Sequence, residues 1–593
     1  MLRLVWLFLA CLPLFPQPAR ALDPSKRISQ YAHAAWRAQD GFFRGTPFEM
    51  TQTRDGYLWV ASSAGLLRFD GVRFVPWPPE HGARLPGPNV FRLVTGRDGS
   101  LWIATSGGVG HWKNETLTNY STGPSGAFAM FEDSRGHVWL GQPLLPETPQ
   151  PLCRIIDLQA PCVGVPGVPP IHGIAAIAED AHGDVWIGGS AALVRWSSGS
   201  STVYEPSGLK SNSATGVDAL VAMADGTMWV GIAKAGPGLG LQHLVQGHWQ
   251  SFKARELDGD SLIVSALRVD RDGALWVGTS DRGLYRLRLR DRSVDHVDSM
   301  SGLSGDFVNG LTEDREGNVW VSTNQGVDRF SDTPVVSFSS REGLCSTEVQ
   351  SVMAGRDGSV WVGGDSGLSR LQDGRVSCIR SGHGLPGTQV TSLLEDHVGR
   401  LWVGIDNDLW MYEHNAFRRV AKPDGSAIGF VFGIAEDAEH RIWVTVGGSP
   451  RRLLRIDGSS VQEELHDQSP RRVVADPTGG VWLGMVSGDL AHYEDGTVVT
   501  HRFPHETPGG VQQLLANPDG SILGATTFGL IGWNNGKQFM LTPKNGLPCA
   551  SVYAMTYDDR ANLWLFMDCG IGEITGADLI KWRSNPEAQM SMR

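Results

Sequence analysis

Short apolar runs, separated by polar turns that contain glycine, recur along almost the whole chain. In "EDREGNVWVSTNQGVDRF" (313–330), an acidic residue and a turn precede an apolar run with a tryptophan, and a second glycine precedes the next run. The stretches "VDRDGALWVGTSDRGLYRL" (269–287) and "EDHVGRLWVGIDNDLWMY" (395–412) follow the same order. Runs of this length bounded by Gly and Asp predict β-strands joined by tight turns. The recurrence indicates one supersecondary unit that is used many times.

The repeated unit is anchored by a tryptophan in twelve copies, at Trp59, Trp102, Trp139, Trp186, Trp229, Trp276, Trp320, Trp361, Trp402, Trp443, Trp482 and Trp564. A thirteenth copy, "PDGSILGATTFG", has Leu523 in this place. Successive anchors lie 37 to 47 residues apart, mostly 39–44. A period near 40–45 residues with about four strands per unit is typical of a β-propeller. The sequence therefore predicts an all-β fold of four-stranded antiparallel blades.

Each unit carries an Asp-x-x-Gly turn between its first and second strands. Glycine adopts a positive φ there without strain, and the Asp side chain can accept bonds from turn amides. Eleven of the thirteen units keep this glycine, while His440 and Ala561 replace it in the other two. We expect the tryptophan to pack between adjacent blades, which cover both faces of each sheet.

The thirteen units divide into two rings. The segments 28–43 and 333–345 have a similar layout, and each precedes a series of units like an outermost strand that closes a ring. The predicted domains are a first propeller of seven blades (22–332) and a second with six visible blades or an incomplete seven (333–593). A ring closed in this way hides its free strand edges, whereas an incomplete ring exposes edges that can pair with another chain.

The composition fits an exported globular protein. The chain has 593 residues, 41% of them hydrophobic, a net charge of −12 and a pI near 5.8, which argues against a nucleic-acid partner. Arg3, a short apolar run and "ARA" (19–21) predict a signal peptide, 1–21, cleaved after Ala21. The alternative is an uncleaved membrane anchor. No later segment is apolar for long enough to cross a membrane, so we expect a periplasmic location.

Six cysteines follow the signal peptide, an even number that favours disulfides in an exported chain. The near pairs are Cys153–Cys162 and Cys549–Cys569, and Cys345–Cys378 is the remaining pairing among fifteen connectivities. No C-x-x-C or helical His pair is present, so neither a metal nor a cofactor is expected.

Three stretches resemble the two-component regulator propeller family: "DGYLWVASSAGLLRFDG" (55–71), "GNVWVSTNQGVDRF" (317–330) and "GLPCASVYAMTYDDRANLWLFMDCGIGEI" (546–574). The resemblance implies paired seven-bladed propellers that sense a ligand in the periplasm for a membrane sensor histidine kinase. Such propellers are usually followed by an immunoglobulin-like domain, a transmembrane helix and a kinase. Here only "RSNPEAQMSMR" follows Trp582, so kinase activity is not implied, and a sensor kinase or other signalling protein is the expected partner.

Binding is a better explanation of the polar residues than catalysis. The stretch "GPGLG" (236–240) lacks the following Lys-Ser/Thr of a phosphate loop, and no nucleophile–base pair stands out. Loops between second and third strands converge on one face of a propeller. In the second ring we assign to a polar cup Asn324, Gln325, Asp365, Asp406, Asn407, Arg451 and Asp568.

Such a cup would suit a carbohydrate or another small polar ligand. The plainer alternative is that these are solvated turn residues. Two further functions stay open: a secreted propeller enzyme, such as a lyase or glycan-cleaving enzyme, and a scaffold that binds another protein.

Overall fold

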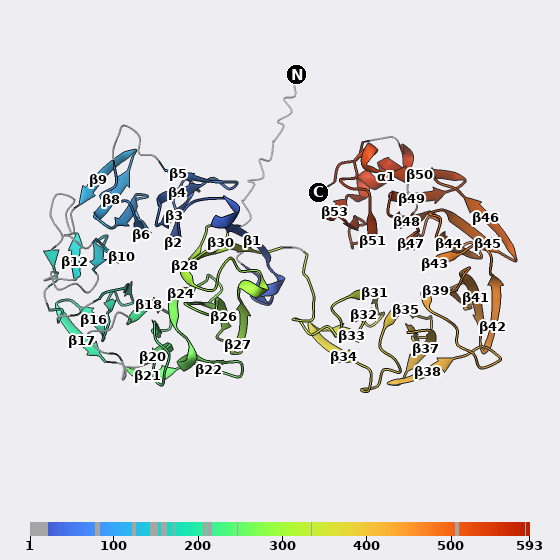
Figure 1. Cartoon of the computed structure of the whole chain (residues 1–593), viewed down its shortest axis with the longest axis horizontal. Helices are drawn as coiled ribbons and strands as arrows, with labels where there is room; N and C mark the ends of the chain where they lie inside the picture. The colour runs from blue at the N-terminus through green and yellow to red at the C-terminus, as the bar shows by residue number, and fades with distance from the viewer. Residues whose placement is uncertain are drawn as a thin grey trace, which may run out of the picture. The chain divides into compact units, whose positions relative to one another are not determined.

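The computed structural model describes residues 22–592 except 78–83, 121–125, 143–151, 156–162, 166, 170, 172, 206–208, 210–215, 246, 334, 505–508 and 587–588. The predicted signal peptide therefore lies outside the described residues. The chain forms two compact units, Met1–Ser337 and Phe338–Arg593 (Figure 1). Within the described residues no helix is long and apolar enough to span a membrane.

The first unit contains seven four-stranded antiparallel sheets, here called the first ring. Six sheets use consecutive strands: β2–β5 (Pro47–Gln52, Leu58–Ser62, Gly65–Phe69, Phe74–Pro76), β6–β9 (Val90–Thr95, Leu101–Thr105, Gly108–Lys113, Thr116–Tyr120), β10–β13 (Ala129–Glu132, Val138–Gly141, Leu152–Ile155, Val163–Gly164), β14–β17 (Ala176–Glu179, Val185–Gly188, Leu193–Ser197, Ser200–Tyr204), β18–β21 (Val217–Ala222, Met228–Ile232, Leu241–Val245, His248–Ser251) and β24–β27 (Val264–Val269, Leu275–Thr279, Leu284–Arg288, Ser293–Val297). A small hairpin is formed by β22 (Lys253–Ala254) and β23 (Leu257–Asp258).

The seventh sheet joins the two ends of the first ring, as the sequence predicts. It combines β1 (Ala32–Arg37) with β28 (Val308–Glu313), β29 (Val319–Thr323) and β30 (Gly326–Ser331). β1 pairs antiparallel with β30, from Ala32 opposite Ser331 to Arg37 opposite Gly326. The Trp36 ring stacks on Trp320, with centroids 5.5 Å apart. β28 also packs beside β2, so the circle is complete.

The second unit contains six sheets in its described residues, here called the second ring. Five have four strands: β31–β34 (Val349–Ala354, Val360–Gly364, Gly367–Gln372, Arg375–Ile379), β35–β38 (Val390–Glu395, Leu401–Ile405, Asp408–Glu413, Ala416–Val420), β39–β42 (Val431–Glu436, Ile442–Val446, Arg452–Asp457, Ser460–Leu465), β43–β46 (Pro470–Ala475, Val481–Met485, Leu490–Glu494, Thr497–His501) and β47–β50 (Gln513–Ala516, Ile522–Thr526, Gly529–Asn534, Lys537–Leu541). The sixth has three, β51–β53 (Val552–Tyr557, Leu563–Met567, Gly570–Ile574).

Helix α1 (Gly576–Ser584) follows β53, where a fourth strand stands in the other sheets. Leu579 and Trp582 of α1 are buried against residues of the preceding sheet, including Phe539 and Leu541. Short 3₁₀ turns lie at Ile28–Gln30, Ala38–Asp40, Gly259–Ser261, Ser299–Ser301 and Pro543–Asn545.

The prediction of an outermost strand at 333–345 is wrong, because the described residues of this segment form no strand. In the first ring the equivalent strand, β1, pairs with the third strand of a seventh sheet. In the second ring the last sheet, β51–β53, has only three strands, and α1 rather than this segment follows its third strand.

The Asp-x-x-Gly-x-x-Trp spacing has a direct structural cause. In the turn after β28, Asp314 Oδ1 accepts the Asn318 amide, and Asp314 Oδ2 accepts the Trp320 indole N–H at 2.7 Å. Seven other units make the same indole bond, from Trp139, Trp186, Trp276, Trp402, Trp443, Trp482 and Trp564. One carboxylate therefore closes the turn and also satisfies the polar atom of a ring that packs against the next sheet.

Adjacent sheets meet through a small residue two places after the anchor. A Cβ at Gly363 would lie 2.4 Å from Val390 Cγ1 of the next sheet, and a Cβ at Gly278 would lie 2.5 Å from Val308 Cγ1. Twelve of the thirteen units have a small residue here: Ala61, Ala104, Gly141, Gly188, Gly231, Gly278, Ser322, Gly363, Gly404, Thr445, Gly484 and Ala525. The last unit has Phe566 instead.

The second ring is open between its first and last sheets. β51 and β31 do not pack together as β28 and β2 do, and Figure 1 shows the six sheets around an incomplete circle. Val349 of β31 is 46% exposed, whereas its counterparts Val390 and Val431 are fully buried. On the last sheet, Phe566 is 53% and Ile571 52% exposed.

Each of the two sheets with an open face contains a disulfide. Cys345–Cys378 ties the segment before β31 to β34, and Cys549–Cys569 ties the residues before β51 to the loop after β52. The third predicted pair, Cys153–Cys162, involves a residue outside the described part of the chain.

Candidate functional site

The predicted cup residues lie in loops between second and third strands, but they do not all belong to one ring. Asn324 and Gln325 connect β29 to β30 in the sheet that closes the first ring. Their assignment to the second ring is wrong, since this sheet precedes the boundary between the two units. Both are exposed. The predicted cup residues are therefore divided between the two units.

Two of the remaining carboxylates fasten loops together. Asp406 accepts bonds from the Thr388 and Gln389 amides, at 3.2 and 2.9 Å, and so ties its own loop to the one that enters the same sheet. Asp568 accepts the Tyr553 hydroxyl. Asn407 is exposed, and its backbone carbonyl accepts the Gly429 amide. These residues fit the plainer alternative of structural turns.

Asp365 and Arg451 keep buried polar atoms that the fold does not satisfy. Asp365 Oδ1 and Arg451 Nη1 are buried and have no hydrogen-bond partner among the described residues. The Arg451 guanidinium lies 4.1 Å from the ring centroid of Phe432, a cation–π contact. Unsatisfied polar groups are costly in a fold, so they point to a ligand or ordered water.

A better candidate than the loops is a layer of β-bulges on the innermost strands. In ten of these strands one extra residue interrupts the register with the second strand. We call these residues the bulge layer: Phe48, Phe91, Asp218, Ser265 and Asn309 in the first ring, and Gln350, Thr391, Phe432, Arg471 and Tyr553 in the second. Bulges commonly re-aim side chains beside functional sites.

In the first ring, part of the bulge layer lines a central cavity. Asp218, Ser265 and Asn309 border it, with Glu49 and Arg92 one residue further along their strands. Burial raises the pKa of Asp218 to about 6, although nearby Arg92 lowers it. Burial also raises the pKa of Glu49, and Arg92 opposes that shift too. The cavity measures about 140 Å³, room for only a few water molecules at about 30 Å³ each.

Aromatic rings occupy another part of the same layer. Phe48 and Phe91 have centroids 5.8 Å apart, and Phe91 stacks on Phe128 at 4.6 Å. Phe128 is 39% exposed. The first ring therefore presents an apolar arc and a buried acid, but its cavity of about 140 Å³ is smaller than the roughly 300–1,000 Å³ of typical ligand pockets.

In the second ring, the bulge layer carries positive charge. Arg471 is the bulge residue of β43, Arg472 follows it, and Arg451 lies in the preceding loop 447–451. Burial, together with the nearby charges of Arg471 and Arg451, lowers the pKa of Arg472 to about 10. Burial likewise lowers the pKa of Arg471, with Arg451 adding to the effect. None of the three forms an ion pair with a carboxylate in the described part of the chain.

The arginine cluster lies against aromatic side chains and backbone carbonyls. Arg472 donates to the carbonyls of Gln512 and Phe432. Phe432 packs on Phe430, with centroids 4.9 Å apart, and carries Arg451 on its face. Arg471 Nε and Arg451 Nη1 are buried and unbonded among the described residues. The cluster thus offers unused donors and uncompensated charge, which suits an anionic group.

Sequence reasoning identified Arg451 but not Arg471 or Arg472. The available signal was "PRR" (470–472) at the start of an innermost strand. The residues equivalent to Arg472 are small in four of the five other sheets of this ring: Ser351, Ser392, Gly433 and Ala554. A charged residue at this position is therefore an exception within the second ring, although Glu49 and Arg92 hold the same position in the first.

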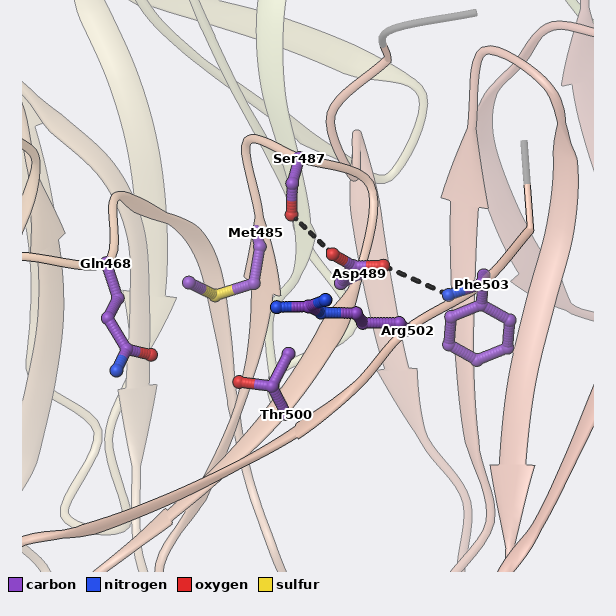
Figure 2. Close-up of a pocket in the computed structure, with 7 residues that line it drawn as sticks. All are labelled: Gln468, Met485, Ser487, Asp489, Thr500, Arg502 and Phe503. Carbon is purple, nitrogen blue, oxygen red and sulfur yellow. Dashed lines mark hydrogen bonds between the residues drawn. The ribbon is translucent and has the colours of Figure 1, made fainter. Parts of the chain in front are cut away.

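A separate depression of about 560 Å³ lies on the sheet β43–β46 and the loops beside it (Figure 2). Asp489 at its wall accepts the Ser487 hydroxyl at 2.8 Å and the Phe503 amide at 3.0 Å. Figure 2 shows Arg502 lying between Asp489 and Thr500. Thr500 belongs to the outermost strand, β46, so this depression is peripheral to the channel.

Three segments of the chain, 258–281, 302–325 and 384–407, match a family profile described as two component regulator propeller. Each segment covers the first two strands of one sheet and the turn between them. No curated protein sequence matches the chain. The profile therefore matches part of two sheets in the first ring and part of one sheet in the second.

The fold matches that of a solved extracellular domain. The extracellular domain of a hybrid two component system from B. thetaiotaomicron has 20% identity and a TM-score of 0.70, over 92% of this chain and 77% of that one. The extracellular domain of a one component system from the same organism has 17% identity and a TM-score of 0.41, over 95% and 78%. Virginiamycin B lyase from Staphylococcus aureus has 14% identity and a TM-score of 0.39, over 51% and 100%. The first similarity establishes the fold, and the other two carry no inference.

Proposed function

We propose that this chain, built from two component regulator propeller repeats, is an exported sensory module that binds a small anionic ligand without catalysis. The observation that carries the proposal is the cluster of Arg451, Arg471 and Arg472 beside Phe432, with no ion-paired carboxylate among the described residues. Keeping three guanidinium groups together without an anion is unfavourable, so the arrangement is suited to a bound one.

The ligand class follows from the donors and the aromatic surface. Guanidinium groups bind carboxylate, sulfate and phosphate through paired N–H donors, and an aromatic face packs against the apolar face of a sugar. We therefore favour a carboxylate- or sulfate-bearing carbohydrate over a neutral one. The first-ring cavity, with buried Asp218 and Glu49, is too small for such a molecule.

The proposal also states where the protein is located and what kind of protein it acts on. A signal peptide at 1–21, cleaved after Ala21, would place the module in the periplasm, where a membrane sensor kinase or another signalling protein would respond to it. Cell fractionation and N-terminal sequencing of the mature protein test the first point. Co-purification from cross-linked membranes tests the second.

Ligand binding is tested with pairs of compounds that differ in charge alone. The purified protein is titrated calorimetrically with glucuronate and glucose, and with sulfated and unsulfated forms of one disaccharide. We expect binding of at least one anionic member and none of its neutral partner. Arg471→Ala should weaken that binding by about 10- to 100-fold, as expected for the loss of a charged hydrogen bond.

Arg455→Ala is the matched control. Arg455 also lies in the second ring, but it pairs with Glu464 at 3.1 Å and should leave affinity unchanged. Arg471→Ala should also stabilise the unliganded protein slightly, because it removes repulsion from Arg472 and Arg451. Equal binding of neutral and anionic compounds, or an Arg471→Ala variant with normal affinity, would contradict the proposal.

A further inference from the structure

Two histidines gather around one glutamate between neighbouring sheets of the second ring. His397 lies in the turn after β35, and His440 lies in the turn after β39, next to Glu436 at the end of that strand. His397 Nδ1 contacts Glu436 Oε1, and His440 Nδ1 lies 3.5 Å from the same oxygen. The two imidazole rings stack with centroids 3.6 Å apart.

Part of this arrangement is a general feature of the fold. Glu436 Oε2 accepts the His397 backbone amide at 2.8 Å. The same bond recurs between other sheets, from Arg97 to Glu132, Arg271 to Glu313 and Arg356 to Glu395. The carboxylate is therefore positioned by the repeat, and the imidazoles are additions to it.

Both imidazoles occupy positions where the repeat has other residues. Arg stands in the place of His397 in five units, at Arg54, Arg97, Arg271, Arg315 and Arg356. His440 replaces the turn glycine that eleven units keep, and its φ is +64°. A left-handed conformation is unfavourable for a residue with a Cβ, so this histidine weakens the turn relative to glycine. A strained residue that completes a cluster indicates a function for that cluster.

We propose that His397, Glu436 and His440 form a binding site for a divalent transition metal such as Zn²⁺. One ligand atom from each residue lies within 4.8 Å of the others, the one such group with histidine or cysteine and acid ligands in the described part of the chain. Two imidazole nitrogens and a carboxylate oxygen are a common three-residue zinc set, with the fourth position left open to solvent. The His side chains are 38% and 57% exposed, which leaves the rings free to rotate into coordination distance.

The neighbouring carboxylates are already occupied, which limits the ligand set to these three residues. Asp437 Oδ2 accepts the Trp443 indole and the Arg441 guanidinium, at 2.6 and 2.7 Å. Asp396 Oδ2 is bonded in the same way by Trp402 and Arg400. A bound metal would link the turns of two adjacent sheets, on the face opposite the loops between second and third strands. The site is thus independent of the proposed anion site.

The test is a calorimetric titration of the metal-free, untagged protein with ZnCl₂, followed by the visible absorption of a Co²⁺-loaded sample. We expect saturable binding of one Zn²⁺ per chain and the intense Co²⁺ bands of a tetrahedral site. His440→Gly and His397→Arg should each lower the Zn²⁺ affinity by about 100-fold or more, because each removes a ligand. Both variants restore residues that other units use, so they should fold.

His414→Gly is the matched control. His414 is another exposed histidine with a positive φ, +51°, in the β37–β38 turn, and its Nδ1 lies 3.9 Å from a Glu413 carboxylate oxygen. This variant should bind Zn²⁺ like the parent. The proposal fails if the parent shows no saturable binding, or if Zn²⁺ binding survives both His440→Gly and His397→Arg.

Discussion

The two rings are built from the same repeat, yet their first and last sheets are arranged differently. In the first ring β1, from the N-terminal end, pairs with β30 of the last sheet, and Trp36 stacks on Trp320. The second ring leaves Val349, Phe566 and Ile571 half exposed and places a disulfide in each of the two sheets concerned. In the second ring each of these disulfides fastens one end sheet to the segment that precedes it, and neither joins the two end sheets to each other. Their bulge layers differ as well, with Asp218 in one and Arg471 in the other.

The largest expected effect comes from removing a disulfide of the second ring. Replacing Cys345 and Cys378 by serine frees a segment with a sequence separation of 33 residues, which should lower the free energy of unfolding by roughly 3–4 kcal/mol. Guanidinium denaturation measures the change, and hydrogen exchange locates it. The loss of protection should be confined to the second ring. Equal loss of protection in the first ring would show that the rings unfold as one unit.

A comparable effect is expected from Trp36→Ala, whose counterpart in the second ring is Phe338→Ala. Both positions lie five residues before a glycine of the closing segments, Gly41 and Gly343. Trp36 packs on Trp320 and Phe69, so its loss should cost about 3 kcal/mol. Phe338 is 39% exposed in a segment that forms no strand, and its loss should cost less than about 0.5 kcal/mol. Thermal denaturation of both variants measures these losses of stability. Similar losses for the two variants would contradict the conclusion that only the first ring is closed by its N-terminal segment.

Asp218, in the bulge layer of the first ring, should make the free energy of unfolding depend on pH. Arg471, in the bulge layer of the second ring, should not. Asp218 has a pKa of about 6 when folded against a reference of 3.8, so the stability that it contributes is present below pH 4 and lost as the pH rises through 6. Asp218→Asn should match the parent at pH 4 and exceed it by about 2–3 kcal/mol at pH 7.5.

Arg471→Gln is the comparison in the second ring. Arginine keeps its charge across this range, so the difference in unfolding free energy between Arg471→Gln and the parent should stay constant from pH 4 to pH 8. Urea denaturation at a series of pH values measures both variants. A pH-independent difference for Asp218→Asn would mean that Asp218 does not titrate near pH 6.

The smallest expected effect is at the position two places after the anchor, which is buried between sheets in the first ring and half exposed in the last sheet of the second ring. Ala61 is fully buried between two sheets of the first ring, so Ala61→Phe should cost roughly 1–3 kcal/mol through overpacking. Phe566 holds the same place in the last unit and is half exposed, so Phe566→Ala should change the free energy of unfolding by less than about 0.5 kcal/mol. Urea denaturation measures both. A large loss for Phe566→Ala would mean that the open face is covered in solution.

Much of the fold follows from the repeat alone. The thirteen anchors predict the number and order of the sheets, and the strand before Pro47 predicts how the first ring closes. The segment 333–345 has a similar pattern, but a strand needs a partner edge, and pairing between distant segments cannot be read from one of them. Helix α1 in place of a fourth strand is likewise a tertiary outcome, since Leu579 and Trp582 are buried against the preceding sheet.

The candidate sites were less accessible to sequence reasoning. The loops between second and third strands were a sound general choice, but Asp406 and Asp568 are used to fasten those loops. The bulge layer depends on one extra residue per strand, which alternating apolar patterns do not reveal. The His397–Glu436–His440 group joins residues about forty positions apart, and only its departure from the repeat, His440 for glycine, is visible in the sequence.

The bulk of Phe566 bears on how such rings grow during evolution. Propellers gain sheets by duplication of a unit, and a duplicate usually fits because each unit presents a small residue to the valine of the next. A copy inserted after the last unit here would bring that valine against an aromatic ring. A sheet packed on this face would therefore meet Phe566 where twelve other units present a small residue, so the bulk at position 566 works against adding a unit here.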